Sequence, residues 1–276
     1  MQTFNEMLRR RIGERNSLVC VGLDVDPGRI PESLKSHPDP VFAFNREIIR
    51  ATRDLVLAYK PNLAFYESLG QEGWDILRRT LSVIPEGVIK IGDAKRGDIG
   101  NTAAQYARAL FSMGFDAVTV NPYMGSDSIE PFTKDPYRGI FILCLTSNPG
   151  SRDFQYLIAG SRPLYLHVAE KTRQWNRNGN CGLVTGATHP GELKAIRETA
   201  GDLPFLIPGI GAQGGDLEAS VLAGTDQQGS MAVVNSSRGI LYASSGPDFA
   251  QAAARETQVL RDSINSIRRV KKPGVP

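Results

Sequence analysis

Cysteine and histidine are scarce in this sequence. Its 276 residues include three histidines and three cysteines, and Cys20, Cys144 and Cys181 lie far apart inside apolar runs. No CxxC pair occurs, and the histidines show no metal-ligand spacing. A disulfide framework and a structural zinc site are therefore both disfavoured, and we expect reduced, buried thiols in a cytoplasmic protein.

Long apolar runs and a strong charge imbalance are also missing. No run approaches the ~18 apolar residues that span a bilayer, so we expect no membrane anchor. Residues 1–17, MQTFNEMLRRRIGERNS, carry charges throughout and lack the apolar core of a secretory signal, so they predict an amphipathic first helix. Lys and Arg number 32 against 29 Asp and Glu, and the resulting net charge of +3 is too small to predict nucleic-acid binding.

What the sequence does contain is a regular alternation of β-rich runs with helical patterns. The helical periodicity is clear in FAFNREIIRATRDLV and GNTAAQYARALFSMG. The β-rich runs cover residues 17–26, 57–66, 87–95, 116–123, 139–147, 180–188, 204–211 and 230–239. Strong runs that alternate with helices are typical of a parallel sheet, and eight such units predict an α/β protein with the closed (β/α)8 TIM barrel fold.

An open, doubly wound sheet is the alternative fold. That fold usually carries a glycine-rich phosphate fingerprint after its first strand, whereas the first run here continues as GLDVDPGRIP without GxGxxG. No linker or further repeat is visible, so residues 1–276 are expected to form one domain. Residues 148–162, NPGSRDFQYLIAGSR, follow the fifth run and predict a lid over a site, with a surface excursion without a role as the alternative.

Charged residues mark the ends of three predicted strands, which is where the active sites of such barrels lie. The first strand ends with Asp24, Lys60 interrupts the second, and Asp93 and Lys95 end the third, with Asp98 just beyond it. One such charge is most simply part of a structural ion pair. Charges at the same end of three strands indicate a site, and their alternating signs favour the ionised form of each group.

The charged array predicts proton-transfer chemistry. Asp93 and Lys95 are two residues apart on a strand, so we expect their side chains on one face, with Lys60 approaching from the neighbouring strand. A lysine held as ammonium can donate a proton, whereas imine formation needs the neutral amine. The pattern therefore favours a lyase in which Lys95 protonates a carbanion. Asp93 would repel a substrate carboxylate, and loss of CO2 would relieve that repulsion.

Two stretches near the C-terminus predict a phosphate site. PGIGAQGG (208–215) and NSSRG (235–239) follow the seventh and eighth strands, where many barrels bind phosphate. Glycines leave backbone N–H groups free to point at phosphate oxygens, and Arg238 offers a bidentate charge. Tight-turn glycines are the commoner reason for such a loop, but the arginine at this location favours phosphate binding.

Together these residues resemble the orotidine 5′-phosphate decarboxylase family. The family pattern Asp-x-Lys-x-x-Asp-Ile-x-x-Thr is complete here as Asp93, Lys95, Asp98, Ile99 and Thr102. The resemblance extends over nearly the whole chain, and YKPNLAFYES and LTSNPGS are similar to the longer bacterial branch. It implies decarboxylation of orotidine 5′-monophosphate to UMP in the last step of pyrimidine synthesis, with no metal and no organic cofactor.

The resemblance also implies a role for each charged residue of the array. Lys95 is expected to donate the proton to C6 of the pyrimidine, with Asp93 beside the departing carboxylate. Lys60 completes the array and contacts the ribose, as does Asp24.

Further roles follow from the same resemblance. Ser147 is expected to contact the amide edge of the pyrimidine. Gln213 and Arg238 are expected to hold the phosphate, with Gln213 also bridging toward the base. Asp98 and Thr102 are expected to reach into the active site of the other subunit, which implies a homodimer.

Two other functions stay open at this point. Ser237 precedes Arg238 where more familiar family members have glycine, and the 208–215 loop carries extra glycines. A related magnesium-dependent sugar-phosphate lyase, such as a hexulose-phosphate synthase or a ketogulonate-phosphate decarboxylase, looks built on a similar Asp-x-Lys-x-x-Asp core. A non-catalytic barrel that binds a nucleotide phosphate is the alternative from a different class.

Overall fold

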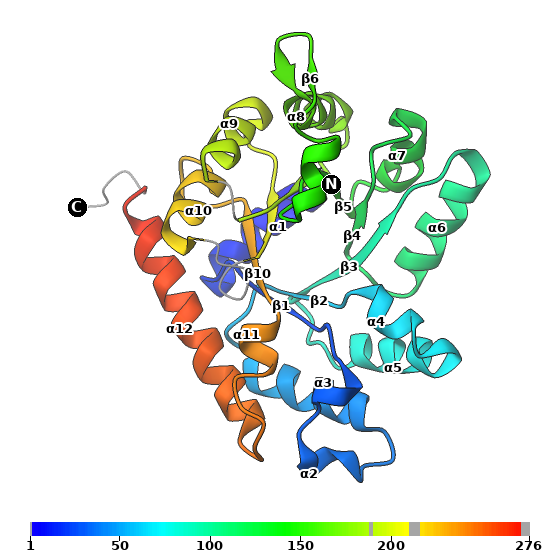
Figure 1. The fold of residues 1–276 in the computed structure, drawn as a ribbon, viewed down its shortest axis with the longest axis vertical. Helices are drawn as coiled ribbons and strands as arrows, with labels where there is room; N and C mark the ends of the chain where they lie inside the picture. Colours follow the sequence, from blue (N-terminus) through cyan, green and yellow to red (C-terminus); the bar gives the residue numbers. More distant parts are fainter. Residues whose placement is uncertain (1, 188–189, 210–215, 272–276) are drawn as a thin grey trace.

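A closed barrel of parallel strands forms the centre of the molecule (Figure 1). The computed structural model describes residues 2–187, 190–209 and 216–271. Around the barrel the strands follow the order β1-β10-β9-β8-β5-β4-β3-β2. These strands are β1 (Val19–Gly22), β2 (Ala58–Lys60), β3 (Ile89–Arg96), β4 (Ala117–Val120), β5 (Gly139–Leu145), β8 (Cys181–Thr185), β9 (Phe205–Pro208) and β10 (Ala232–Ser236). Each of the eight predicted runs coincides with one of these strands, with β3 ending one residue beyond its run, which confirms the (β/α)8 fold.

Helices cover the outside of the barrel in a ring (Figure 1). The longer ones are α3 (Pro40–Thr52), α5 (Gly70–Ser82), α6 (Gly100–Ser112), α7 (Ser126–Thr133), α8 (Leu164–Trp175), α9 (Pro190–Ala200), α10 (Leu217–Gly224) and α12 (Phe249–Arg269). Each buries an apolar stripe against the strands, as α3 does with Phe44, Ile48 and Ile49. Because helices face the strands outside and side chains fill the barrel inside, the strands read as continuous apolar runs.

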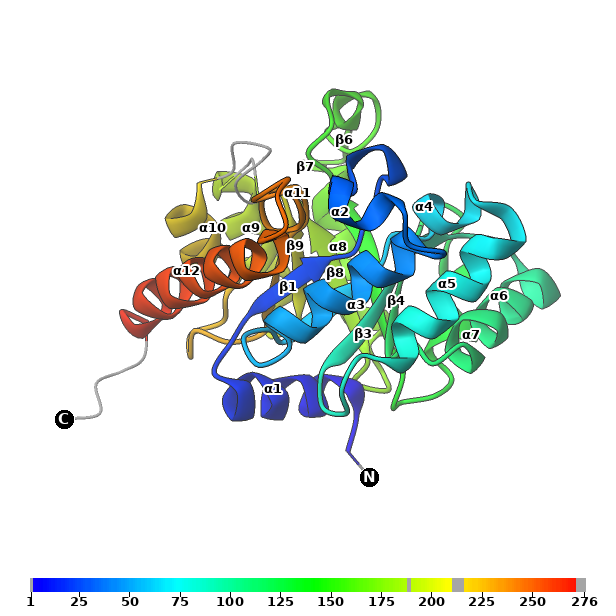
Figure 2. The same ribbon diagram turned by 90° about the horizontal axis from the view of Figure 1, so that it is seen from below.

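Helix α1 (Phe4–Arg15) closes the end of the barrel where the strands begin (Figure 2). Thr3 and Glu6 form a capping box at its start, and its buried face presents Phe4, Leu8 and Ile12 to the barrel. The Phe4 ring meets the ring of Phe141 on β5 edge-on, with centroids 6.2 Å apart. The amphipathic first helix predicted from the sequence is therefore confirmed.

The second β-rich run, residues 57–66, was expected to be a strand throughout, and this expectation is wrong for its last four residues. Strand β2 ends at Lys60, and residues 63–66 belong to helix α4 (Leu63–Glu67). Pro61 offers no backbone N–H to the sheet, and the Asn62 side chain accepts a hydrogen bond from the Ala64 N–H at 3.2 Å as a helix cap. The proline and the helix cap together favour a helix at residues 63–66, despite the β-rich composition of LAFY.

The segment after the fifth strand, residues 148–162, has structure of its own. It begins with the 3-10 turn η2 (Pro149–Asp153) and continues into a small antiparallel hairpin of β6 (Ile158–Ala159) and β7 (Arg162–Pro163). In Figure 2 this hairpin projects from the barrel on the side opposite α1. Three apolar side chains of the segment, those of Phe154, Leu157 and Ile158, are exposed.

The other short elements lie at the same end of the barrel. They are η1 (Pro27–Arg29), α2 (Glu32–Lys35), α4 and α11 (Arg238–Leu241). None of the helices in the described ranges combines the length and apolar character needed to cross a membrane.

Candidate active site

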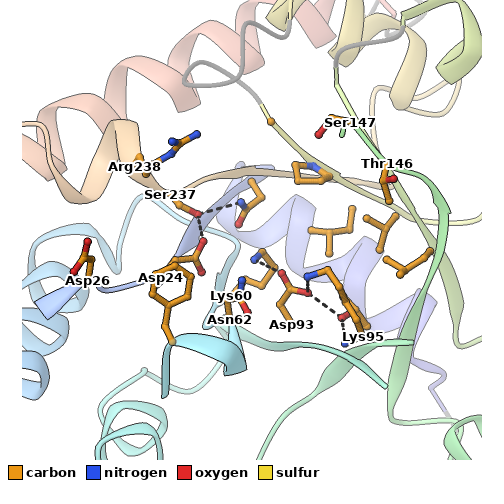
Figure 3. Close-up of a pocket in the computed structure, with 18 of the residues that line it drawn as sticks. Asp24, Asp26, Lys60, Asn62, Asp93, Lys95, Thr146, Ser147, Ser237 and Arg238 are labelled. Atoms are coloured by element: carbon orange, nitrogen blue, oxygen red, sulfur yellow. Dashed lines mark hydrogen bonds and ion pairs between the residues drawn. The ribbon is translucent and has the colours of Figure 1, made fainter. Parts of the chain in front are cut away.

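A cavity of about 480 Å³ opens at the end of the barrel where the strands finish (Figure 3). Its polar lining comes from the ends of several strands, and its apolar lining includes Leu143, Val184 and Leu206. A space with one apolar wall and a few convergent polar groups suits a flat organic ring that carries charged substituents.

At the centre of the polar lining, Asp93 lies between two lysines. The Lys60 Nζ is 2.9 Å from Asp93 Oδ2, and the Lys95 Nζ is 2.6 Å from Asp93 Oδ1. The Thr119 hydroxyl, on β4, also donates to Asp93 Oδ1 at 3.0 Å. The Lys60 side chain is only 4% exposed, whereas that of Lys95 is 47% exposed and faces the cavity. We call Lys60, Asp93 and Lys95 the charged array.

Mutual attraction keeps the charged array ionised. Burial by itself disfavours the carboxylate of Asp93, but the ammonium groups of Lys60 and Lys95 outweigh burial and hold its pKa well below the usual range. Burial alone would likewise lower the pKa of Lys60, but the carboxylates of Asp24 and Asp93 raise it above the usual range. The cationic form of Lys60 is therefore favoured by two carboxylates, that of Asp24 just after β1 and that of Asp93 on β3.

The backbone at Lys95 departs from regular strand geometry. The pairing of β3 with β4 shifts register between Gly92 and Arg96, and Lys95 has a left-handed φ of 47°. Such a conformation costs a non-glycine residue about 1–3 kcal/mol. The Lys95 N–H is held there by a hydrogen bond of 2.9 Å to Thr119 Oγ1. The structure does bring Lys95 to Asp93, but through this bulge rather than through the regular two-residue alternation that we expected.

Asp24 approaches Lys60 from the β1 side of the cavity. The Ser237 hydroxyl donates to Asp24 Oδ2 at 2.8 Å, and the Asn235 amide lies 3.4 Å from the same hydroxyl oxygen (Figure 3). Ser237 can come this close only because Gly22 has no side chain, since a Cβ there would lie 1.9 Å from Ser237 Oγ. The serine that departs from the family pattern therefore anchors Asp24.

Ser237 and Asn235 were not predicted as individual site residues. Both belong to the NSSRG stretch, which pointed to phosphate through its arginine alone. Asn62 was also missed, although it lines the cavity and bridges to Asp93 as a strand partner. Its position two residues beyond Lys60, at the same strand end, was the available signal.

The residues predicted to contact phosphate and base lie on different parts of the cavity wall. Arg238 begins α11 and lines the cavity, as do Thr146 and Ser147 after β5 (Figure 3). Arg29, which the sequence did not single out, lines it as well. Gln213 lies outside the residues that the structure describes.

Asp98 and Thr102 lie beyond the end of β3, near the start of α6. The Asp98 carboxylate accepts a hydrogen bond from the Ile99 N–H at 2.8 Å, and Thr102 is exposed in the first turn of the helix. Neither is among the described residues that line the cavity of their own chain.

Comparison with known proteins places this chain in a family. Residues 17–255 match the model of the orotidine 5′-phosphate decarboxylase / HUMPS family. The chain belongs to this family. A relative named orotidine 5′-phosphate decarboxylase, from Dehalococcoides mccartyi, is 53% identical over 271 residues, which cover 96% of this chain and 98% of the relative. The family match includes every residue named above as lining the cavity.

Solved structures of the same family share the fold. The OMP decarboxylase of Leishmania donovani is 41% identical, with a TM-score of 0.84 over 97% of this chain and 99% of that one. The UMP synthase of the same organism is 42% identical with a TM-score of 0.86, and this chain spans 57% of its length. The decarboxylase family resemblance seen in the β3 motif is therefore confirmed over nearly the whole chain.

Proposed function

We propose that this cavity decarboxylates orotidine 5′-monophosphate to UMP, as a carboxy-lyase of pyrimidine biosynthesis. The observation that carries the proposal is the charged array of Lys60, Asp93 and Lys95 at the strand ends of a barrel that belongs to the decarboxylase family. Relatives that match nearly the whole chain bear the decarboxylase name, which favours this reaction over the sugar-phosphate lyase and the non-catalytic barrel.

In the reaction, the bond between C6 and the carboxylate carbon breaks and its electron pair stays on C6. Lys95 Nζ supplies a proton to C6 as CO2 leaves, and the lysine regains a proton from solvent, which its half-exposed side chain can reach. The ionised Asp93 repels the carboxylate of the bound substrate, and that repulsion ends as the carboxylate becomes neutral CO2. Only an interaction that improves toward the transition state accelerates a reaction in this way.

The remaining contacts are assigned along the length of the cavity. Lys60 and Asp24 hold the ribose, and Ser147 contacts the amide edge of the pyrimidine. Arg238 binds the phosphate, together with Gln213. Segment 148–162 closes over phosphate and base, and a hydrogen bond of 2.8 Å from the Thr146 N–H to the Gln155 side chain ties it to the cavity wall. Phosphate binding far from C6 supplies energy for closure and positioning.

The catalytic unit is a homodimer of single-domain chains, in which Asp98 and Thr102 complete the partner's cavity. Two observations support this proposal. Neither residue lines the cavity of its own chain, and the exposed apolar side chains of Ile99, Tyr123 and Met124 lie on the loops that follow β3 and β4. The three unpaired cysteines suit a reducing compartment, which supports a cytoplasmic location.

The test is the loss of orotidine 5′-monophosphate absorbance with purified protein in excess EDTA, beside a Lys95→Ala variant of confirmed secondary structure. We expect turnover without metal. Removal of the proton donor in Lys95→Ala should lower kcat by about 10²–10⁴-fold. Turnover of a sugar phosphate only after Mg²⁺ is added would move the chain to the lyase alternative. Full activity of Lys95→Ala would refute the role of the lysine.

A further inference from the structure

Arg29 lies on the wall of the cavity, and no salt bridge joins it to any residue that the structure describes. It ends the turn η1 that follows β1, and Asp26 holds this turn by accepting a hydrogen bond from the Gly28 N–H at 2.9 Å. Among the residues that the structure describes, no carboxylate forms an ion pair with the Arg29 guanidinium and no acceptor receives a hydrogen bond from it. An exposed cation held at the edge of a ligand cavity is available to a negatively charged ligand.

The aromatic ring of Tyr242 holds the Arg29 guanidinium in place. The Cζ atom of Arg29 lies 3.8 Å from the centroid of that ring, within cation–π range. On the protein side, Phe44 stacks with Tyr242 at 6.1 Å and an interplanar angle of 21°. The Tyr242 hydroxyl accepts a hydrogen bond of 2.8 Å from the Asp26 N–H. The Tyr242 ring is thus held by stacking with Phe44 and by the hydrogen bond at its hydroxyl. Because the ring is held, the Arg29 guanidinium stacked on it loses little conformational freedom when it binds a ligand.

Tyr242 also connects Arg29 to Arg238. The Tyr242 N–H donates to the Arg238 carbonyl oxygen at 3.2 Å, so α11 begins with one arginine and is followed directly by the tyrosine on which the other is stacked. Arg238, like Arg29, has no ion-pair partner among the described residues, and both line the cavity. Figure 3 shows Arg238 on the side of the cavity away from Lys95. Two guanidinium groups on the wall of one cavity, neither in an ion pair with a described residue, match a dianion better than one.

We propose that Arg29 is a second phosphate-binding residue, beside Arg238, and that Tyr242 is its positioning residue. This inference rests on the proposed function for the identity of the nucleotide. The ligand group is a phosphate monoester, which carries close to two negative charges at neutral pH and presents enough oxygens for both guanidinium groups. If the contact between Arg29 and Tyr242 served only to hold the η1 turn, its removal would instead lower kcat/KM equally for substrates with and without a phosphate.

The experiment compares orotidine 5′-monophosphate with orotidine, the same substrate without its phosphate, in an Arg29→Met variant. We expect kcat/KM to fall by about 10- to 100-fold for the nucleotide, the scale of one hydrogen bond between charged groups, and by less than about threefold for orotidine. The matched control is Lys35→Met. Lys35 pairs with Glu32 at 2.6 Å and lines the neighbouring hollow with Arg29, but not the substrate cavity.

Binding of UMP and uridine, measured by calorimetry, tests the same contact without turnover. Arg29→Met should weaken the binding of UMP by a similar factor and leave the affinity for uridine unchanged. Tyr242→Leu should reproduce part of this phosphate-specific loss, and Tyr242→Phe, which keeps the ring but not the hydroxyl, should lose less phosphate-specific binding than Tyr242→Leu. Equal losses for both ligands, or none for either, would overturn the assignment of Arg29. Absence of orotidine 5′-monophosphate turnover in the unaltered protein, with UMP still bound through Arg29, would refute the reaction instead.

Discussion

Replacing Asp93 by asparagine should destabilise the protein far more than removal of an exposed carboxylate. Asp93 contacts two ammonium groups, at 2.9 and 2.6 Å, and its side chain is only 12% exposed. Removing one partner of a buried pair leaves an uncompensated buried charge and typically costs about 3–5 kcal/mol. Lys60 is the buried charge that would lose a partner here, although Asp24 would still compensate part of it. The loss is a large share of the ~5–15 kcal/mol that stabilises most proteins.

The dependence of this loss on pH provides a second test. The pKa of Asp93 is lowered in the folded state, so its contribution is present above its unfolded pKa of about 3.9 and disappears as pH falls below that value. The contribution of Lys60, whose folded pKa is raised, is fully present below about pH 10 and disappears only above it. The gap between wild type and Asp93→Asn should therefore be constant from about pH 5 to 9 and narrow below about pH 4.

Urea unfolding followed by circular dichroism at several pH values measures this gap. Asp54→Asn is the matched control, since the Asp54 side chain is 89% exposed and its contact with Arg53 is 3.9 Å long. Exposed pairs are worth about 0–1 kcal/mol. A loss at Asp93 no larger than that at Asp54, or a gap that widens in acid, would refute the assignment of Asp93 as a buried, ionised partner of the two lysines.

Three further outcomes follow from other parts of the fold. Burial raises the pKa of the Cys20 and Cys181 thiols to about 12. A thiol reagent at pH 8 should therefore label neither cysteine until denaturant is added. Rapid labelling of the folded protein would contradict their burial. The Arg197 guanidinium donates to four backbone carbonyl oxygens. Arg197→Met should therefore lower the free energy of unfolding, measured in urea, by at least about 2 kcal/mol. An unchanged midpoint of the urea unfolding curve would contradict this role. Gly139→Ala should lower the free energy of unfolding by about 1–3 kcal/mol, because the new Cβ would lie 2.4 Å from the Phe4 ring. An unchanged melting temperature of this variant would instead show that α1 can shift freely.

The barrel could be predicted from the sequence because each strand carries its own signal. A strand buried on both faces must be apolar throughout, and glycine or proline marks its ends. The site could be located for a related reason. Parallel strands all finish at the same end of the barrel, so Asp24, Lys60 and Asp93 had to meet without any knowledge of the distances between them. Where local signals competed, as at residues 63–66, composition alone gave the wrong element.

The contacts that the sequence did not reveal are those created by closure of the barrel. Ser237 and Asp24 are 213 residues apart and meet because β1 pairs with β10. Tyr242 and Arg29 meet across the same seam. The bulge at Lys95 is hidden for a different reason, since it depends on the register between β3 and β4 and on the Thr119 hydroxyl, and neither has a pattern in the sequence.

The composition of the charged array indicates selection for chemistry rather than for stability. Apolar side chains could fill the mouth of the barrel as they fill its interior, and well-packed apolar groups usually stabilise a protein as much as a buried ion pair or more. This chain instead places Lys60 between Asp24 and Asp93, and holds Lys95 in a left-handed backbone conformation beside them. Desolvation and strain both oppose that arrangement. The proposed roles of Asp93 and Lys95 in decarboxylation give the arrangement a purpose that stability does not.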